Sequence, residues 1–292
     1  MHSMTENQKR YLSDFSLLLV AVTWGGGFVA VKDALSAMPP MTLLSLRFVL
    51  AAGVHYLFLH RKIGKINRSD LKKGAVLGVL LYLAFSAQTI GLIYTTASKQ
   101  GFLTATYVVM VPLILWVYSK RRPMKKDLIG GVVTLVGIGL IGISEHLTLN
   151  IGDVLTLLCA FFFAVHILAT AVFSREMDVF KLSFLQIFFA AILFTVSAWL
   201  FEPMPSVIAL SDWGAVFYLA VFSTFLCFTI QTAAQKHTAA SHASILLSLE
   251  SVFAALFGIV LLHEQMTFRI AIGCLLIFTA VWIVELNLKK RA

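Results

Sequence analysis

Ten apolar segments, each about 20 residues long, follow one another along almost the whole chain. A helix of about that length spans the hydrocarbon core of a bilayer, which is roughly 30 Å thick. Because 59% of the residues are hydrophobic and only 13% are charged, the sequence predicts an all-α integral membrane protein with ten transmembrane helices and no room for a soluble catalytic domain. We expect these helices near residues 13–35, 41–60, 72–93, 98–118, 126–143, 152–173, 180–201, 212–234, 240–262 and 268–287.

The basic residues are distributed unevenly between the two sides of such a bundle. If both termini are cytoplasmic, 19 of the 23 lysine and arginine residues fall on the cytoplasmic side. Lys32, Lys99 and Arg269 fall outside, and Arg47 lies within a span. By the positive-inside rule this asymmetry predicts a multi-pass protein with both termini in the cytoplasm. The net charge of +9 is explained by this orientation, and we expect no nucleic-acid partner.

The second half of the chain repeats the first. Each half, 13–143 and 152–287, holds five spans, and an odd number of spans requires the second half to enter the membrane from the opposite side. Inverted repeats of this kind are typical of secondary transporters, which bind their substrate near the midplane between the halves. The identical pairs are Leu83/Leu226, Phe85/Phe228, Gln88/Gln231, Thr89/Thr232, Thr95/Thr238, Ala97/Ala240, Ser98/Ser241, Leu103/Leu246, Val109/Val252, Leu113/Leu256 and Gly130/Gly273 at an offset of 143, and Asp14/Asp153, Leu18/Leu157, Leu19/Leu158, Ala21/Ala160 and Ala30/Ala169 at an offset of 139.

Short motifs in three spans add a family resemblance. They are Trp24-Gly25-x-x-Phe28 in the first, Leu46-Arg47-Phe48 in the second, and Leu249-Glu250-x-Val252-Phe253-Ala254-Ala255-Leu256 followed by His263-Glu264 in the ninth. In this order the chain resembles a bacterial member of the drug/metabolite transporter superfamily of the EamA type. The resemblance implies two inverted five-helix repeats in the bacterial cytoplasmic (inner) membrane. Ser251 stands where the family commonly has proline, and Lys120-Arg121-Arg122 stands where the first repeat would end in Gly-Glu, so no particular substrate is implied.

Glu250 is the most unusual residue of the ninth span, because a carboxylate in the middle of a membrane helix is costly unless it faces a partner, the protein interior or water. Three interpretations stay open for it: it binds a cationic substrate, it exchanges protons, or it forms a structural contact with Arg47. The repeat places Tyr107 at the position equivalent to Glu250.

Five further polar or aromatic residues near the middle of spans are expected to line a substrate site with Glu250. Trp24 and Tyr107 are suited to stack on an organic cation or ring, and His166 to carry protons near neutral pH. Gln88 and Gln231 are suited to hydrogen-bond a substrate or a neighbouring helix. For each of these side chains, packing within the helix bundle is the alternative interpretation.

Two residues outside this set have expected structural or gating roles. Arg47 either binds a substrate carboxylate or forms a structural pair, so we treat it as a gating or structural charge. Pro112 is expected to bend the fourth span, because an internal proline removes a helix hydrogen bond.

These patterns favour a secondary transporter over an enzyme. His263 and Glu264 begin a zinc-binding HExxH pattern, but Thr267 stands where its second histidine is required, and no phosphate-binding glycine loop is present. We therefore expect no catalytic residues, bound metal or cofactor. The expected partners are membrane lipid and a small-molecule substrate, namely an amino acid or a related amphipathic compound. The family resemblance implies export more often than import, although the residues themselves do not set the direction.

Several alternatives stay open. The protein could instead take up an organic cation or a vitamin-like solute, or act as a membrane sensor that transports nothing. Coupling to protons and facilitated diffusion are both compatible with the sequence, as are a monomer and a homodimer.

Overall fold

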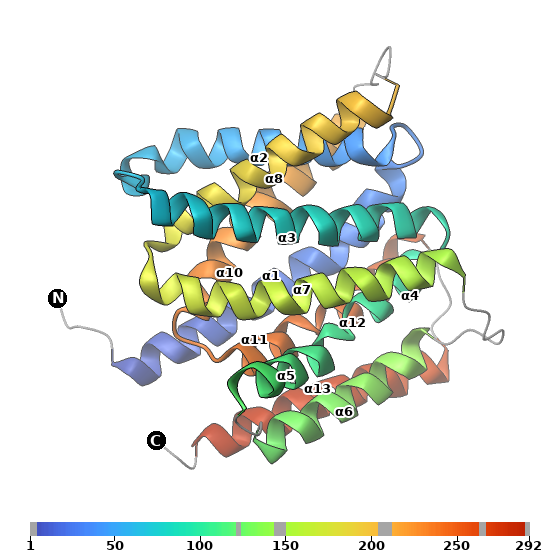
Figure 1. The fold of residues 1–292 in the computed structure, drawn as a ribbon. Coiled ribbons are helices and arrows are strands. Elements are labelled where there is room, and N and C mark those ends of the chain that lie inside the picture. Colours follow the sequence, from blue (N-terminus) through green and yellow to red (C-terminus); the bar gives the residue numbers. More distant parts are fainter. Residues whose placement is uncertain (1–4, 121–123, 143–149, 204–211, 263–266, 290–292) are drawn as a thin grey trace.

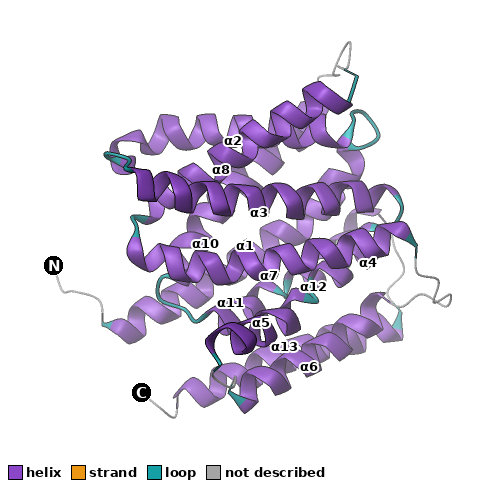
Figure 2. Ribbon diagram, in the orientation of Figure 1, coloured by secondary structure: helices purple, strands orange, loops and turns teal. Residues whose placement is uncertain are grey.

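The computed structural model describes residues 5–120, 124–142, 150–203, 212–262 and 267–289, and this part of the chain is helical apart from short connections (Figures 1 and 2). Eight helical segments are long and apolar enough to cross a membrane, and Leu128–Leu140 and Phe268–Trp282 are shorter apolar stretches. Together they correspond to the ten predicted spans. The elements are α1 (Glu6–Ala34), α2 (Pro40–Ile63), α3 (Arg68–Ile93), α4 (Ala97–Thr104), α5 (Tyr107–Ser119), α6 (Lys125–Gly142), α7 (Ile151–Glu176), α8 (Val179–Phe201), α9 (Asp212–Phe217), the π-helix η1 (Tyr218–Leu226), α10 (Cys227–Gln235), α11 (Ala240–Leu247), α12 (Glu250–Leu262) and α13 (Phe268–Lys289).

The fourth and ninth spans are each divided into two helices, and the two breaks fall at equivalent positions of the repeat. Helix α5 begins at Tyr107 and α12 begins at Glu250, which are related by the offset of 143. The break in the fourth span lies before Pro112, which is inside α5, so the predicted site of the bend is displaced toward the start of that span.

Local hydroxyl groups explain where these helices break. The Thr106 hydroxyl donates to the Leu103 carbonyl at 2.6 Å, and the Ser248 hydroxyl donates to the Ile245 carbonyl at 2.7 Å. Backbone hydrogen bonds at both breaks tighten to three-residue spacing, as from Val108 N to Ala105 O at 3.1 Å. Side chains that compete for backbone groups in this way favour interruptions of a helix.

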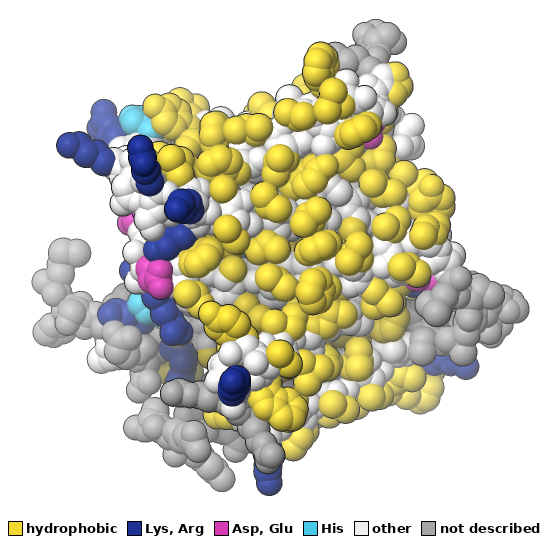
Figure 3. Space-filling model, viewed as in Figure 1, with side chains coloured by type: hydrophobic (Ala, Val, Ile, Leu, Met, Phe, Trp, Pro, Cys, Tyr) yellow, Lys and Arg dark blue, Asp and Glu magenta, His cyan; other side chains and the backbone are white. Residues whose placement is uncertain are grey.

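The two ends of the bundle differ in charge. Helix α1 begins and α13 ends on the same side, at the left of Figure 1. Lys and Arg side chains gather mainly on that side, whereas hydrophobic side chains cover most of the face between the two ends (Figure 3). By the positive-inside rule the basic side is predicted to be cytoplasmic, and this orientation stays a prediction. We call this side the inner end and the opposite side the outer end.

Glu202, just after α8, caps the start of α2. Its carboxylate accepts hydrogen bonds from Met41 N at 2.8 Å and from Thr42 N at 2.7 Å, two of the amide groups that a helix start leaves without a partner. The negative charge also suits the positive end of the helix dipole. One side chain thereby ties α2 to α8 at the outer end.

Replacing Glu202 by alanine is expected to lower the free energy of unfolding by about 1–2 kcal/mol, because the α2 amides lose a charged acceptor. Thermal or denaturant unfolding in detergent measures the change. Glu176→Ala is the matched control, since the Glu176 side chain is 53% exposed and its removal is expected to cost under about 1 kcal/mol. Equal losses in both variants would contradict the capping role.

A candidate substrate cavity between the repeats

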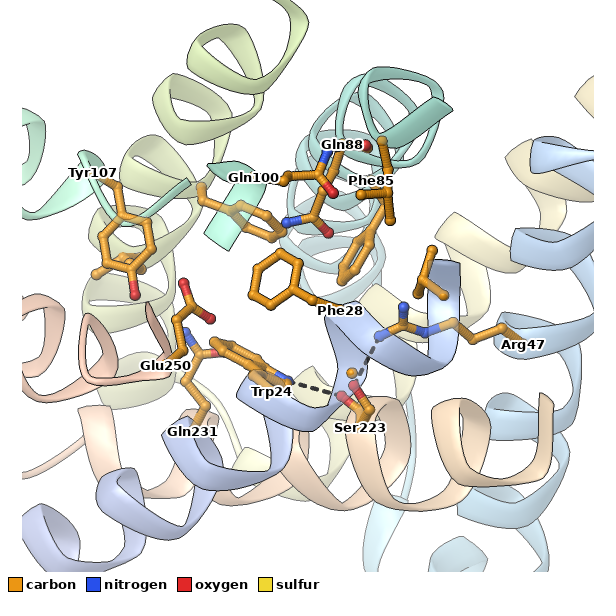
Figure 4. Close-up of a pocket in the computed structure, with 15 residues that line it drawn as sticks. Trp24, Phe28, Arg47, Phe85, Gln88, Gln100, Tyr107, Ser223, Gln231 and Glu250 are labelled. Atoms are coloured by element: carbon orange, nitrogen blue, oxygen red, sulfur yellow. Dashed lines mark hydrogen bonds between the residues drawn. The ribbon is translucent and has the colours of Figure 1, made fainter. Parts of the chain in front are cut away.

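A cavity lies where residues from both halves of the chain meet (Figure 4). Its volume is about 40 Å³, which is room for a few water molecules since each needs at least roughly 10–15 Å³. Helices α1, α2, α3, α4, α5, α7, α10 and α12 and the π-helix η1 contribute to its wall. The lining residues are Trp24, Gly27, Phe28, Val31, Arg47, Phe85, Gln88, Leu92, Gln100, Tyr107, Phe163, Ile167, Ser223, Gln231 and Glu250.

The acidic end of the cavity is built from the two helix breaks. Glu250 and Tyr107 are the first residues of α12 and α5, and Figure 4 shows the Tyr107 hydroxyl directed toward the Glu250 carboxylate. Both residues are buried, with exposed fractions of 3% and 2%. The start of α12 favours a negative charge, because the amide groups of a helix N-terminus are partly positive.

Three buried polar atoms at this end have no hydrogen-bond partner among the described residues: Glu250 Oε1, Tyr107 Oη and Gln231 Oε1. A buried polar atom without a partner costs about 1–3 kcal/mol. Bound molecules that donate hydrogen bonds to the two acceptors and accept one from the tyrosine would remove this cost. This end is therefore suited to a ligand that carries an ammonium or another donor group.

The basic end of the cavity is formed by Arg47 on α2. Arg47 Nε donates to Thr224 Oγ1 at 2.6 Å and Nη2 donates to Ser223 Oγ at 3.1 Å. The guanidinium also lies 4.5 Å from the centre of the Phe85 ring, in a cation–π contact. Within the described part of the chain Arg47 makes no ion pair, so the proposed structural contact with Glu250 is not formed here.

The π-helix η1 forms part of the cavity wall between the acidic end and the basic end. In η1 the Ser223 carbonyl accepts a hydrogen bond from Trp24 Nε1 at 2.9 Å, and Tyr218 Oη donates to the Thr23 carbonyl at 2.7 Å. The wider turn of a π-helix leaves backbone groups available for such contacts, and π-helical turns are frequent at functional sites. Ser223 therefore positions Trp24 through its carbonyl and Arg47 through its hydroxyl.

The wall near α3 and α4 is polar. Gln88 Nε2 donates to Thr104 Oγ1 at 3.3 Å, and Gln100 Nε2 donates to the Gln88 carbonyl and to Thr156 Oγ1. Gln100 Oε1 is buried and lacks a hydrogen-bond partner among the described residues. In addition to Glu250 Oε1 and Gln231 Oε1, this oxygen is thus a third acceptor available to a bound molecule.

The structure brings most of the predicted site residues together. Trp24, Gln88, Tyr107, Gln231 and Glu250 line the cavity, and so does Arg47. Their roles in binding stay predictions.

His166 is not part of the lining. It is fully buried, and its Nε2 lies 2.8 Å from Gln186 Oε1, so it joins α7 to α8 instead of reaching the cavity. The motif residues His263 and Glu264 lie outside the described residues.

Gln100, Ser223, Phe28 and Phe85 are lining residues that the sequence analysis did not select. Gln100 corresponds to Ala243 in the other repeat, so it is not found by looking for positions that are polar in both repeats. Phe85 is identical to its repeat equivalent Phe228, and this identity could have identified it as a candidate. For Ser223 the sequence offers no comparable signal.

The sequence profile of the EamA-like transporter family matches residues 12–143 and 150–286. This chain belongs to the EamA-like transporter family. A protein of Archaeoglobus fulgidus named an uncharacterized transporter is 37% identical over 288 residues, covering 97% of this chain and 88% of that protein. A Bacillus subtilis protein, also named an uncharacterized transporter, is 25% identical over 94% of this chain and 97% of its own length.

Two further similarities are to a named efflux pump and to a solved structure. A Salmonella typhimurium protein named a probable amino-acid metabolite efflux pump is 30% identical over 167 residues, which is 51% of this chain and 50% of that protein. A solved crystal structure superposes with a TM-score of 0.80 at 18% identity, covering 95% of this chain and 97% of that one. The second similarity concerns the fold alone. The EamA-like family and its named members show that the chain is a multi-pass membrane protein of a transporter family.

Proposed function

We propose that the protein is a secondary transporter that moves small metabolites, namely amino acids or related amphipathic compounds, across the cytoplasmic membrane by alternating access. The observation that carries this proposal is the position of Glu250 and Tyr107. They begin helices at equivalent breaks of the two repeats and face one cavity. Interrupted helices that meet at the interface of inverted repeats are where secondary transporters bind their substrates.

The charges of the cavity support a substrate that carries both signs. Glu250 lies at one end and Arg47 at the other, with Trp24 and Phe28 between them (Figure 4). A carboxylate is complementary to an ammonium group, and a guanidinium is complementary to a carboxylate. The aromatic side chains between the charges are suited to an apolar portion. An amphipathic zwitterion satisfies all three requirements.

Export is the proposed direction, in keeping with the efflux named for the Salmonella typhimurium relative. The alternative substrate is an organic cation, because Trp24 and Tyr107 accompany Glu250 in the cavity and aromatic rings attract cations. In that case Arg47 would hold Ser223 and Thr224 in place and would not contact the substrate.

Two measurements on purified protein test the proposal. A thermal-shift screen against amino acids, quaternary amines, nucleobases and vitamins identifies ligands, because a molecule that binds the folded state raises its Tm. Counterflow of the labelled hit in proteoliposomes then measures transport. We expect an amino acid or a related zwitterion both to raise Tm and to exchange. Binding without exchange would favour a sensor, and the absence of both would contradict the proposal.

Replacing Arg47 by glutamine is expected to weaken zwitterion binding at least tenfold, because a hydrogen bond to a charged group contributes about 1.5–3 kcal/mol. Affinity for the matching amine without a carboxylate should change less than about threefold. The ratio of the two Kd values, measured by titration calorimetry, separates a substrate contact from a general loss of structure. Equal weakening for both ligands would assign Arg47 a structural role.

A further inference from the structure

Two polar contacts at opposite ends of the bundle occupy equivalent positions of the two repeats. At the outer end Lys99 Nζ lies 2.7 Å from Asp153 Oδ2 and joins α4 to α7. At the inner end His242 Nε2 lies 3.4 Å from Asp14 Oδ1 and joins α11 to α1. His242 follows Lys99 by 143 residues and Asp153 follows Asp14 by 139, the same offsets that relate the two halves of the chain.

The two contacts have different supporting hydrogen bonds. Asp14 Oδ1 accepts a hydrogen bond from Thr238 Oγ1 at 3.0 Å, whereas Asp153 Oδ2 accepts one from Asn150 N at 3.0 Å. The Asp153 side chain is fully buried, and the Asp14 and His242 side chains are each 7% exposed. Both aspartates are therefore buried, and a buried carboxylate that loses its partner is strongly unfavourable.

The contacts lie on either side of the cavity at matching distances along the helices. Asp14 precedes the lining residue Trp24 by ten residues, and Asp153 precedes Phe163 by ten, which is about 15 Å along a helix. Lys99 precedes Tyr107 by eight residues, and His242 precedes Glu250 by eight. Tyr107 and Glu250 are the residues at the two helix breaks. One contact therefore stands between the cavity and the outer end, and its equivalent stands between the cavity and the inner end.

We propose that these are the two gates of the transport pathway. Lys99–Asp153 closes the outer end, and Asp14–His242, supported by Thr238, closes the inner end. Both contacts are made in this structure. Opening toward one side breaks the contact at that end and retains the other. The inference rests on the proposed function, since a gate requires a pathway.

The reactivity of one cavity thiol tests the gates without any substrate. Ser223 lines the cavity, and Ser223→Cys is introduced after Cys159, Cys227 and Cys274 have been replaced by alanine. A membrane-impermeant maleimide is then applied to right-side-out and to inside-out vesicles.

We expect Lys99→Gln to raise the labelling rate at least tenfold from the outside and less than twofold from the inside. His242→Gln and Asp14→Asn should do the reverse. Lys99→Arg, which keeps the charge, should be labelled at the same rates as the protein that carries Ser223→Cys alone.

Lys73→Gln is the matched control, because Lys73 pairs with Glu176 at 2.8 Å but neither residue has a charged repeat equivalent. It should leave labelling from both sides unchanged. The proposal is overturned if the gate variants behave as Lys73→Gln does, or if variants at both ends change labelling from the same side. Failure of substrate exchange would instead contradict the proposed function and leave the gates untouched, because the labelling rates are measured without substrate.

Discussion

Replacing Glu250 by glutamine is expected to reduce substrate exchange at least about 100-fold while the protein still folds. The amide keeps the shape of the side chain but removes the charge that we assign to the substrate ammonium group. Loss of a buried charged partner costs about 3–5 kcal/mol, and 1.4 kcal/mol corresponds to a factor of ten. The effect should be largest on affinity, because Glu250 lies at the cavity and not in the contacts that hold the helices at the two ends.

Counterflow in proteoliposomes and ligand-induced Tm shifts measure this loss. Asp33→Asn is the matched control, since it makes the same chemical change at an exposed residue near the end of α1 and should retain exchange. If Glu250→Gln transports at the rate of the control, the carboxylate is structural and the substrate contact lies elsewhere in the cavity.

The fold was predictable from two properties of the sequence. Segment length and hydrophobicity indicated the ten spans, and the repeat indicated that the halves are inverted. The breaks before Tyr107 and Glu250 were not predictable in the same way, because the average hydropathy of a span does not show where its backbone is interrupted. They depend on the carbonyl to which a single hydroxyl, such as that of Thr106 or Ser248, donates its hydrogen bond, and hydropathy carries no such information.

Repeat symmetry predicted only part of the candidate site. Gln88 with Gln231 and Tyr107 with Glu250 lie at equivalent positions, and all four line the cavity. His166 shows the limit of the method: its repeat partner Gly27 lines the cavity, but the His166 side chain contacts Gln186 on α8. Position along a helix was predictable, whereas the direction of a side chain depends on partners far away in sequence.

Gly25 is a point of close approach between α1 and α12, the helix that carries Glu250. A Cβ atom at this glycine would lie 2.5 Å from Phe253 Cβ and 2.8 Å from the backbone nitrogen of Ala254. The second contact is with backbone, so a rotamer change cannot relieve it and α12 itself would have to shift. Small residues permit this close approach of membrane helices. The contact therefore determines how far Glu250 lies from the Trp24 side of the cavity.

Gly25→Ala is consequently expected to lower the free energy of unfolding by about 1–3 kcal/mol, the usual cost of overpacking, and Gly25→Leu to prevent recovery of folded protein. Tm in detergent and the yield of monodisperse protein measure these effects. Gly53→Ala is the matched control, because a Cβ there meets nothing within 4 Å and alanine favours the helix over glycine. In Gly25→Ala the ligand Kd should also rise, since a displaced α12 moves Glu250 relative to Arg47. Unchanged affinity together with a lowered Tm would show that Gly25 serves packing alone, and that the cavity tolerates displacement of the helix that carries its carboxylate.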